Sequence, residues 1–504
     1  MTNKVKLTAT DGTQVEFVDK IIGQGGMKDV YFSPDKSYVV AFFRDKQDAN
    51  AKARLENIIG VYRQRLFQGP GGDYWKDLYC WPTKIVEHGG RLGIVAPCYA
   101  KDFFFTHGSK KSDFMKIKDK EKEGKWFASA KHRKNILDPR EKGSWKSYLT
   151  ISIKIARAVR RMHMAGLAHS DLSYKNVLID PCGANACIID IDGLVVPGKF
   201  PPDVLGTPDF IAPEVYATNH LKKDDPSRAM PRIETDRHAL AVLIYMYLLY
   251  RHPLRGRKIH DVDDSQRDEM LGMGSEALFI EHGSDRSNRP GKGQMEDAFL
   301  PWADPGKVPY KIVGPYLSEL FEQAFVDGLH NPSVRPTADA WEMALVKTVD
   351  LIQPCSNSAC EQHWYVFDNK KAPSCPFCKT PYKGALPILN LYSSRGLGKP
   401  FRSDNHRLMV YHNQYLHQWH VNRKIVPGER LTAEQSKPVG YFSFHRGRWV
   451  LVNQTLAGMT VLEDGGQKKT PIEQGKSVTL VDGMNLLMSS EDGGRLVQVQ
   501  MVGS

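Results

Sequence analysis

Four residues with useful side-chain chemistry fall close together near the middle of the chain. His169, Asp171 and Asn176 lie within the stretch LAHSDLSYKNVLID, and Asp190 follows Asn176 by fourteen residues in CIIDIDG. An aspartate carboxylate can accept a proton from a reacting hydroxyl group. Aspartate and asparagine oxygens are hard ligands of the kind that Mg²⁺ prefers. These side chains are suited to proton abstraction beside a bound magnesium ion.

Three further motifs follow in a fixed order along the chain. GTPDFIAPEV ends in an Ala-Pro-Glu run at Glu214, ETDRHAL contains Asp236, and NPSVRPTADAW contains Arg335. With the first stretch they resemble the protein kinase catalytic loop, metal-binding segment, activation-segment end, buried helix aspartate and the arginine that pairs with the glutamate. The resemblance covers roughly residues 10 to 350. It implies a bilobal protein kinase fold in a multi-domain α+β protein.

The resemblance also implies roles for the first four residues. Phosphoryl transfer needs positioning and charge neutralisation more than covalent help. Asp171 is expected to accept the proton of the substrate hydroxyl, and Asn176 and Asp190 to hold Mg²⁺ that bridges the phosphates of ATP. GTPDFIAPE is closer to serine/threonine kinases than to tyrosine kinases. The alternative is that Asp171 and Asn176 are ordinary turn residues.

A glycine-rich turn near the N-terminus is expected to cover the phosphates. It lies in IIGQGGMKDVYF, where Gly23, Gly25 and Gly26 permit a close approach of backbone N–H groups. Kinases carry a phosphate-binding lysine on the third strand, but the equivalent run here is VVAFF, which ends in Phe43. Arg44 comes next, and strand alternation points it away from the cleft.

Lys28 is the expected replacement for the missing lysine. The loop GQGGMKDVY resembles that of the with-no-lysine kinases, which carry their lysine in this loop, and Lys28 stands at the matching position. A flexible ammonium group can reach the same phosphate from the loop as from the strand. Glu56 in the following helix is the expected ion-pair partner. The alternative is a solvent-facing Lys28 in a pseudokinase.

Other positions complete the predicted nucleotide site. Val30 is expected to cover the adenine, and Lys175 to supply charge to the γ-phosphate, since Ser173 stands where kinases place a lysine. Asp192 replaces the glycine of the Asp-Phe-Gly motif and is either an additional metal ligand or a solvated turn residue. Ser170 and the single hydroxyl residue of the segment 193–211, Thr207, argue against activation-loop phosphorylation. The remaining residues expected to line the site are Ala41, Ala96 and Cys98.

The elements that must position these residues are strands followed by helices. KVKLTAT and TQVEFVDKI alternate around a DG turn, and KIVEHGGRLGIVAPC predicts a hairpin with a Gly-Gly turn. Residues 48–67 have helical periodicity, with Leu55, Ile58, Ile59, Tyr62 and Leu66 on one face. From Trp145 onward the pattern is mainly helical. The run ALAVLIYMYLLY is too short to span a membrane and predicts a buried helix.

The chain of 504 residues is long enough for two or three domains. Its start has no apolar signal region, so we expect a cytoplasmic protein without a membrane partner. The net charge of +12 comes in large part from residues 101–145, where aromatic residues stand among lysines. This basic segment is either a solvated insertion or a face for an acidic protein. A nucleic-acid partner is not expected, because no base-reading module is visible.

Four of the eight cysteines lie within one short stretch. Cys355, Cys360, Cys375 and Cys378 have the spacing C-x4-C-x14-C-x2-C, which resembles a zinc ribbon. Four thiolates suit Zn²⁺ in a closed structural site, although iron can use the same ligands and His363 can replace one cysteine. So short a segment buries little apolar surface, so the metal is expected to supply its stability.

Residues 386–504 predict an all-β sandwich of short alternating runs separated by glycine and asparagine turns. The order of the runs resembles a forkhead-associated domain, which reads phosphothreonine. Asn453 lies near the position of a ligand asparagine in that family. Because its other phosphate ligands cannot be placed, a protein-docking sandwich is the preferred interpretation.

The predicted order is therefore a kinase-like domain over 1–350 (N-lobe 1–97, basic insertion about 101–145, C-lobe 146–350), a zinc ribbon over 351–384 and the sandwich over 386–504. This order resembles the bacterial serine/threonine kinases of tellurite-resistance-associated TerY-P triads. The resemblance implies ATP, Mg²⁺ and Zn²⁺ as ligands. It also implies a von Willebrand factor A domain protein as substrate and a metal-dependent protein phosphatase as antagonist. The alternatives are a pseudokinase scaffold and a non-catalytic phosphothreonine-binding adaptor.

Overall fold

The structure is a computed structural model that describes residues 3–24, 27–69, 71–196, 199–200, 206–222, 224–291, 304–367, 373–396 and 398–503. The chain divides into two compact units. The first comprises residues 1–143, 150–307 and 320–342, and the second comprises 144–149, 308–319 and 343–504. The protein is thus a mixed α/β protein with several sheets. The domain limits proposed from the sequence stay predictions.

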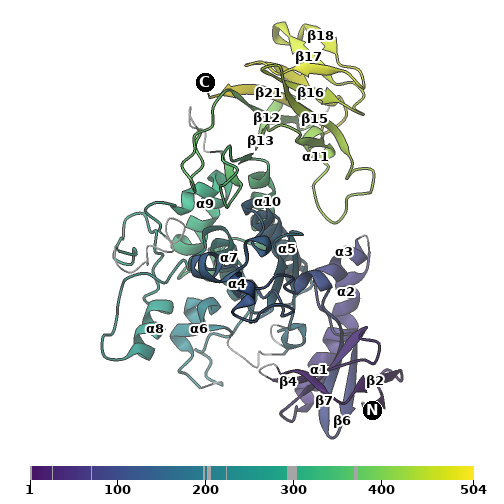
Figure 1. Ribbon diagram of the computed structural model, residues 1–504, viewed down its shortest axis with the longest axis vertical. Helices are drawn as coiled ribbons and strands as arrows, with labels where there is room; N and C mark the ends of the chain where they lie inside the picture. The colour runs from purple at the N-terminus through teal and green to yellow at the C-terminus, as the bar shows by residue number, and fades with distance from the viewer. Residues whose placement is uncertain are drawn as a thin grey trace. The chain divides into compact units, whose positions relative to one another are not determined.

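The first unit contains an antiparallel sheet of five strands, in the order β3-β4-β5-β7-β6 (Figure 1). A separate hairpin precedes it, with Leu7 opposite Val15, as the alternation around the DG turn predicts. The β6–β7 hairpin turns through Gly89 and Gly90, whose positive φ angles of 57° and 77° suit glycine. The strands are β1 (Lys4–Thr8), β2 (Gln14–Val18), β3 (Ile21–Gln24), β4 (Lys28–Phe32), β5 (Tyr38–Phe43), β6 (Lys84–His88) and β7 (Arg91–Pro97).

The two faces of this sheet bury different clusters, because successive side chains of a strand point to opposite sides. Val40, Phe42 and Val95 pack with the β1–β2 hairpin on one face. Ala41, Phe43 and the residues beside them pack with Leu55 on the other. A residue of β4 or β5 is therefore assigned to one face by its parity alone.

The predicted helix over residues 48–67 is present as one continuous helical stretch with a wider turn in its middle. It consists of α1 (Ala49–Asn57), the π-helical η1 (Ile58–Tyr62) and α2 (Arg63–Phe67). Asp48 caps its start by accepting a hydrogen bond from the backbone N–H of Ala51 at 2.7 Å. Leu55, Ile58 and Leu66 are buried, as the periodicity predicts.

Helices make up much of the described chain between residues 72 and 349, most of it in the first unit. All but a few residues at the start of α7 are buried, which confirms the interpretation of its apolar run. The helices are α3 (Gly72–Asp77), α4 (Lys110–Asp113), α5 (Trp145–Met164), α6 (Pro213–Thr218), α7 (Ile233–Leu249), α8 (Ser265–Met273), α9 (Pro315–Glu322) and α10 (Ala338–Val349). The short helical turns are η2 (Lys101–Phe103), η3 (Gly124–Trp126), η4 (His132–Ile136), η5 (Pro139–Glu141), η6 (Ile191–Gly193), η7 (Pro208–Phe210), η9 (Tyr310–Val313), η10 (Gln323–Asp327) and η11 (Pro332–Val334). A short hairpin joins β8 (Val177–Asp180) to β9 (Asn185–Ile188).

The basic segment is folded rather than a solvated insertion. Phe105 and Phe127 are buried and stack on each other with ring centroids 5.8 Å apart. Lys122 is buried as well, and its Nζ lies 2.9 Å from Asp180 and 3.3 Å from Glu141. Residues of this segment are thus packed into the first unit, as Phe103 also shows by clustering with Leu178 and Cys187. The lysines that stay exposed include Lys111, Lys116, Lys118 and Lys120.

The second unit contains the cysteine cluster and two larger sheets. One sheet has the order β13-β12-β21-β20-β17-β18 and the other has the order β14-β15-β16-β19. Inward-facing side chains of both sheets share one core, with Ile388, Phe442 and Leu451 fully buried. The elements are β10 (Ile352–Pro354), β11 (Trp364–Val366), β12 (Leu386–Ser394), β13 (Phe401–Met409), β14 (Tyr415–His417), α11 (Gln418–Val421), β15 (Pro438–His445), β16 (Arg448–Asn453), β17 (Thr460–Glu463), η12 (Asp464–Gly466), β18 (Lys468–Pro471), β19 (Ser477–Thr479), β20 (Asn485–Leu487) and β21 (Arg495–Val502).

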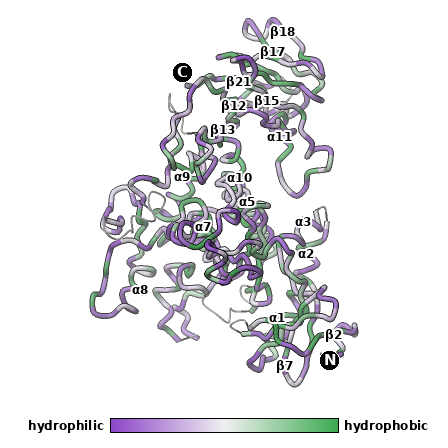
Figure 2. The backbone as a smooth tube through the Cα atoms, viewed as in Figure 1, coloured by the Kyte–Doolittle hydropathy of each residue, from purple (hydrophilic) through white to green (hydrophobic). Residues whose placement is uncertain are grey.

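Polar and apolar residues alternate at short range along much of the coloured tube (Figure 2). Among the helices in the described ranges, none combines the length and apolar character that a membrane span requires.

Candidate active site

The loop that carries Asp171 is held in place by a buried carboxylate on α7. Asp236 is 1% exposed and accepts hydrogen bonds from the backbone N–H groups of His169 at 2.6 Å and Ser170 at 3.0 Å. The Nε2 atom of His169 lies 3.0 Å from the carbonyl oxygen of Ile189. Buried carboxylates hold backbone amides firmly, since neither group has water as an alternative partner. The loop is thus tied both to α7 and to the residue before Asp190.

Asp171 is oriented by hydrogen bonds to both of its carboxylate oxygens. Thr207 donates to Oδ1 from its backbone N–H at 2.6 Å and from its hydroxyl group at 2.8 Å. Asn176 donates to Oδ2 from Nδ2 at 2.8 Å. The same amide group also donates to the carbonyl oxygen of Asp171 at 2.8 Å. The Oδ1 atom of Asn176 is therefore the polar atom that this geometry leaves suited to a metal ion.

Asn176 and Asp190 lie on neighbouring backbone segments. The backbone N–H of Ile189 donates to the carbonyl oxygen of Asn176 at 3.0 Å, which places Asp190 one residue from that bond. Asp190 itself has a left-handed backbone conformation, with φ of 59°. Such a conformation is uncommon outside glycine and marks a tightly specified turn. The two predicted magnesium ligands are thus brought together by the β8–β9 hairpin and the turn that follows it.

Lys28 lies on the same face of the sheet as the predicted nucleotide-lining residues. It stands opposite Phe43 in the β4–β5 ladder, and Val30 stands opposite Ala41. The Nζ atom of Lys28 is 5.3 Å from the centroid of the Phe43 ring. Phe43, at the position expected for a strand lysine, therefore presents its ring to the ammonium group of Lys28.

Arg44 lies on the other face, as strand alternation predicts. Its Nε atom is 3.9 Å from Asp29, and Asp29 also pairs with Arg91 at 2.6 Å. Neighbouring residues of one strand point to opposite sides of the sheet, so Arg44 and Phe43 cannot share a face. Arg44 is thus not placed beside Lys28.

The ammonium group of Lys28 is paired with two aspartates. Nζ lies 3.0 Å from Oδ1 of Asp190 and 2.7 and 2.6 Å from the two carboxylate oxygens of Asp192. Burial lowers the pKa of Lys28, but the charges of Asp192 and Asp190 outweigh it, so the pKa is raised above its ordinary value. Burial raises the pKa of Asp190, and Lys28 reverses the effect, so that this pKa is lowered. Lys28 and Asp190 therefore stay charged at neutral pH.

The predicted partner of Lys28 was Glu56, and the structure differs on this point. Glu56 is exposed on α1, while its neighbour Leu55 is buried. One residue along an α-helix corresponds to a rotation of about 100°, so a carboxylate directly after a buried leucine is turned toward solvent. The ion-pair partners of Lys28 are Asp192 and Asp190, both far away in sequence.

The other predicted site residues are placed as follows. Ala96 has the same strand parity as Ile94, which stands opposite Ala41, so Ala41 and Ala96 share the Lys28 face. Cys98 follows the end of β7, and its thiol lies 3.3 Å from the carbonyl oxygen of Lys36. Gly23 stands opposite Val30, whereas Gly25 and Gly26 lie outside the described residues. Lys175 is exposed in the loop between Asp171 and Asn176.

Two residues that the sequence did not assign with certainty have clear places in the structure. Asp192 is buried and holds Lys28, so it is not a solvated turn residue. Thr207 orients Asp171, and its hydroxyl oxygen lies 3.1 Å from the hydroxyl oxygen of Ser173. The signal for Asp192 was an acid in place of the usual glycine. The signal for Thr207 was its being the single hydroxyl residue of its segment.

The Ala-Pro-Glu glutamate is held by the predicted arginine. Arg335 donates to both carboxylate oxygens of Glu214, from Nη1 at 2.9 Å and from Nη2 at 2.7 Å. The arginine also donates to the backbone carbonyl oxygens of Gly328, Glu234 and Leu329. This paired fork geometry is the strong form of an ion pair. The end of the segment that carries Thr207 is thereby anchored.

We expect Arg335→Ala to destabilise the first unit by about 3–5 kcal/mol, since it leaves a paired carboxylate and several carbonyl oxygens without their donor. Denaturant unfolding of the full chain measures the change. Arg267→Ala is the matched control, because Arg267 is largely exposed and lies 3.5 Å from its partner Asp261. The control is expected to change the free energy by about 0.5 kcal/mol or less. An equal, small effect of both substitutions would contradict the anchoring role.

The four clustered cysteines of the second unit come together as the spacing predicts. Their Sγ atoms all lie within 4.8 Å of one another. Those of Cys355 and Cys378 are 3.5 Å apart, and those of Cys360 and Cys375 are 3.8 Å apart. A tetrahedral zinc site with Zn–S bonds of about 2.3 Å separates its sulfur atoms by about 3.8 Å. The residues therefore fit one tetrahedral metal ion.

His363 serves the backbone of this cluster rather than its ligand set. Its carbonyl oxygen accepts a hydrogen bond from the N–H of Cys355 at 2.7 Å, and its N–H donates to Cys360 at 3.1 Å. Within the described ranges, the side chains that gather as metal ligands are the four cysteines. The less favoured ligand set with His363 is thus not the one that the geometry supports.

Asn453 is buried in the core of the sandwich. Its Nδ2 donates to the carbonyl oxygens of Leu456 and Ile472, and its Oδ1 accepts from the N–H of Leu456 at 2.8 Å. A side chain 0% exposed with all these bonds made is a structural link between loops. The suggestion that Asn453 is a phosphate ligand is therefore not supported by its surroundings.

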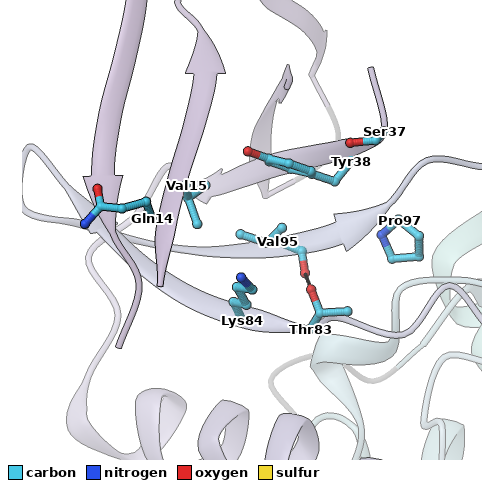
Figure 3. Close-up of a pocket in the computed structure, with 8 residues that line it drawn as sticks. All are labelled: Gln14, Val15, Ser37, Tyr38, Thr83, Lys84, Val95 and Pro97. Atoms are coloured by element: carbon cyan, nitrogen blue, oxygen red, sulfur yellow. Dashed lines mark hydrogen bonds between the residues drawn. The ribbon is translucent and has the colours of Figure 1, made fainter. Parts of the chain in front are cut away.

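A pocket of about 230 Å³ lies elsewhere on the first sheet (Figure 3). Val95 and Tyr38 belong to the side of the sheet that packs with β1 and β2, opposite to the Lys28 side. The pocket is thus separate from the residues described above. Its lining residues are Gln14, Val15, Ser37, Tyr38, Thr83, Lys84, Val95 and Pro97.

Comparisons with known proteins agree with this geometry. The sequence model of the lipopolysaccharide kinase (Kdo/WaaP) family matches residues 144–194, which contain Asp171, Asn176 and Asp190. The serine/threonine-protein kinase PknD of Chlamydia trachomatis serovar D is 26% identical over 277 residues, covering 47% of this chain and 25% of that protein. PknD of Chlamydia pneumoniae is 29% identical over 153 residues, covering 25% of this chain and 15% of that protein. This chain thus spans about a quarter or less of the curated relatives that it matches, and these similarities support a bacterial kinase.

Proposed function

We propose that this protein is an ATP- and Mg²⁺-dependent serine/threonine protein kinase. The observation that carries the proposal is the meeting of Lys28 with Asp190 beside the loop that orients Asp171 and Asn176. A cation, two oxygen ligands and an oriented carboxylate are the parts that phosphoryl transfer requires. Residues from the sheet, from the catalytic loop and from the segment after β9 supply them.

Each of these side chains has a distinct role in the proposed reaction. Asp171, held by Thr207 and Asn176, accepts the proton of the acceptor hydroxyl group. Asn176 Oδ1 and the Asp190 carboxylate are the atoms suited to hold Mg²⁺, which neutralises phosphate charge when bound. Lys28 reaches the phosphates from β4 and adds a second positive charge. Val30, Ala41 and Ala96 offer an apolar face of the sheet to the adenine.

The acceptor is proposed to be a serine or threonine hydroxyl of a protein, in line with the names of the PknD relatives. A second acceptor class is favoured by the family match over residues 144–194, whose name refers to lipopolysaccharide. That acceptor would be a sugar hydroxyl group. Transfer assays with a generic protein acceptor and with purified lipopolysaccharide distinguish the two classes.

The C-terminal modules are proposed to recruit the protein acceptor. The order predicted from the sequence resembles that of the TerY-P triad kinases, which suggests a von Willebrand factor A domain protein as substrate and a metal-dependent protein phosphatase as antagonist. The four-cysteine cluster is proposed to be a zinc ribbon that binds Zn²⁺. The sandwich is proposed as a docking module rather than a phosphothreonine reader, since Asn453 is used within its core.

The main alternative, a pseudokinase scaffold, is tested by Lys28→Ala. We expect the substitution to reduce transfer from Mg²⁺-ATP by about 10²–10³-fold, the range for removal of one group that stabilises developing charge. Labelled ATP with the purified chain, alone and with a generic acceptor, provides the measurement. Lys46→Ala is the control, because Lys46 is an exposed lysine just after β5. Absence of transfer and of Mg²⁺-dependent ATP binding in the parent chain would favour the scaffold.

A further inference from the structure

Asp190 and Asp192 both contact Lys28 but differ sharply in exposure. The Asp192 side chain is 7% exposed and that of Asp190 is 48% exposed. Lys28 contacts both carboxylate oxygens of Asp192, at 2.7 and 2.6 Å, but only one oxygen of Asp190. A buried carboxylate is tolerated only when its charge and its lone pairs have partners. Lys28 is that partner for Asp192, while Asp190 keeps an oxygen open to the site.

The two aspartates are rigidly connected. Both belong to the turn that begins at Asp190 and continues through η6, and Ile191 between them is 1% exposed. The buried Ile191 fixes this turn against the core, so Asp190 and Asp192 cannot reorient independently. Because Lys28 is bound to Asp192, its position relative to Asp190 is set by the short turn that contains both aspartates.

The helix that follows β5, α1, does not position Lys28 in this way. Glu56, its predicted contribution, is exposed on α1. A displacement of α1 would therefore leave the ammonium group of Lys28 with both of its carboxylate partners. The position of Lys28 depends on the metal-binding turn itself.

We propose that Asp192 is the positioning residue of Lys28, and that Asp190 alone of the two serves the metal ion. The proposal rests on the proposed function, in which Lys28 neutralises phosphate charge. In this proposal Asp192 pairs with the phosphate-binding lysine, a role that the sequence comparison with kinases had assigned to a helix glutamate, Glu56.

The test compares four variants of the full chain, Asp192→Asn, Asp192→Glu, Glu56→Gln and Asp180→Asn. Asp180 is the matched control, because it too is a buried carboxylate paired with a lysine, Lys122, at 2.9 Å. The first measurement is the rate at which Lys28 reacts with an amine-selective acylating ester at fixed pH, followed by mass spectrometry. It needs no nucleotide and no activity. The second is kcat and KM for ATP, with the Mg²⁺ concentration that gives half the maximal rate.

In Asp192→Asn we expect Lys28 to react about tenfold faster, the factor that one hydrogen bond to a charged group carries. We expect kcat to fall by about 10²-fold through misplacement of the ammonium group, with little change in the Mg²⁺ requirement. In Asp192→Glu we expect the acylation rate of Lys28 and kcat to return part of the way to the parent values. In Asp180→Asn we expect the acylation rate of Lys28 to equal that of the parent. Should Asp192→Asn fail to fold, Asp192→Glu and Glu56→Gln still decide between the two acids.

Two results would overturn the assignment. The first is a rise in the Mg²⁺ requirement of Asp192→Asn with an unchanged Lys28 rate, which would make Asp192 a metal ligand. The second is faster acylation of Lys28 in Glu56→Gln and not in Asp192→Asn. If no variant and not even the parent transfers phosphate, while the acylation rates behave as expected, the placement of Lys28 is supported and only the kinase activity fails.

Discussion

Replacement of Asp171 by asparagine is expected to lower the rate of phosphoryl transfer by about 10²–10⁴-fold, the usual contribution of a general base. KM for ATP is expected to change little, because the proposed mechanism assigns Asp171 to the acceptor hydroxyl, and Lys28 and Asp190 to the phosphates. The measurement is steady-state transfer from Mg²⁺-ATP to a protein acceptor that the parent chain phosphorylates.

The hydrogen bonds around Asp171 explain why a substitution of nearly equal size has so large an expected effect. Both carboxylate oxygens accept, Oδ1 from Thr207 and Oδ2 from Asn176. An asparagine has only one oxygen there, so its own NH₂ group must face a donor in either orientation. The variant thus loses the base and also disturbs the two residues that orient it.

Thr207→Val provides a graded comparison for this prediction. It removes the hydroxyl donor to Asp171 and keeps the backbone N–H donor at 2.6 Å. A hydrogen bond to a charged group contributes about 1.5–3 kcal/mol, so a loss of about 10- to 10²-fold is expected. If Asp171→Asn retained a rate within tenfold of the parent, Asp171 would not be the base.

Removal of the metal from the cysteine cluster is expected to have the largest effect on stability. Structural zinc binding contributes about 10–16 kcal/mol in small zinc domains, and this energy is folding energy. We therefore expect the purified chain to hold one tightly bound zinc ion. Cys375→Ser and treatment with a strong chelator are both expected to release it and to unfold the segment around residues 355–378. Elemental analysis together with thermal unfolding measures both effects.

The burial of the ligands makes Cys375 the most informative site to change. Cys375 is 0% exposed and Cys360 is 3% exposed, so water cannot take the place of either thiolate. Cys182→Ser is the control, since Cys182 is an exposed cysteine outside the cluster. Its metal content is expected to equal that of the parent. Iron in the purified chain would change the identity of the metal, and an unchanged metal content in Cys375→Ser would reject the site.

Local patterns in the sequence predicted local structure well. Strand alternation alone separated Arg44 from the Lys28 face, and the ion pair of Arg44 with Asp29 lies on the opposite side of the sheet. The Gly-Gly hairpin, the helix over residues 48–67 and the buried run of α7 follow from periods of 2.0 and 3.6 residues. These features depend on the backbone geometry of neighbouring residues, which the sequence carries directly.

The partner of Lys28 is the clearest case in which such patterns were not sufficient. Helix periodicity near Glu56 was compatible with an inward or an outward carboxylate, and the burial of Leu55 decided against the inward one. Asp190 and Asp192 lie 162 and 164 residues from Lys28, so nothing local connects them. Burial distinguishes Asp192 from the exposed Glu56 as a partner of Lys28, because a carboxylate that has lost its contact with water requires a nearby cation.

The sequence by itself identified Asp171, Asn176 and Asp190 as candidates for phosphoryl transfer and four cysteines as candidates for a tetrahedral metal site, since residue type and spacing indicate both. It also excluded Arg44 from the side of the sheet that carries Phe43, because successive residues of a strand point to opposite faces. Only the tertiary structure decided that Asp192 holds Lys28, that Asn453 belongs to the core and that the basic segment is packed. Those outcomes depend on which groups lose contact with water, and that is a property of the folded chain as a whole.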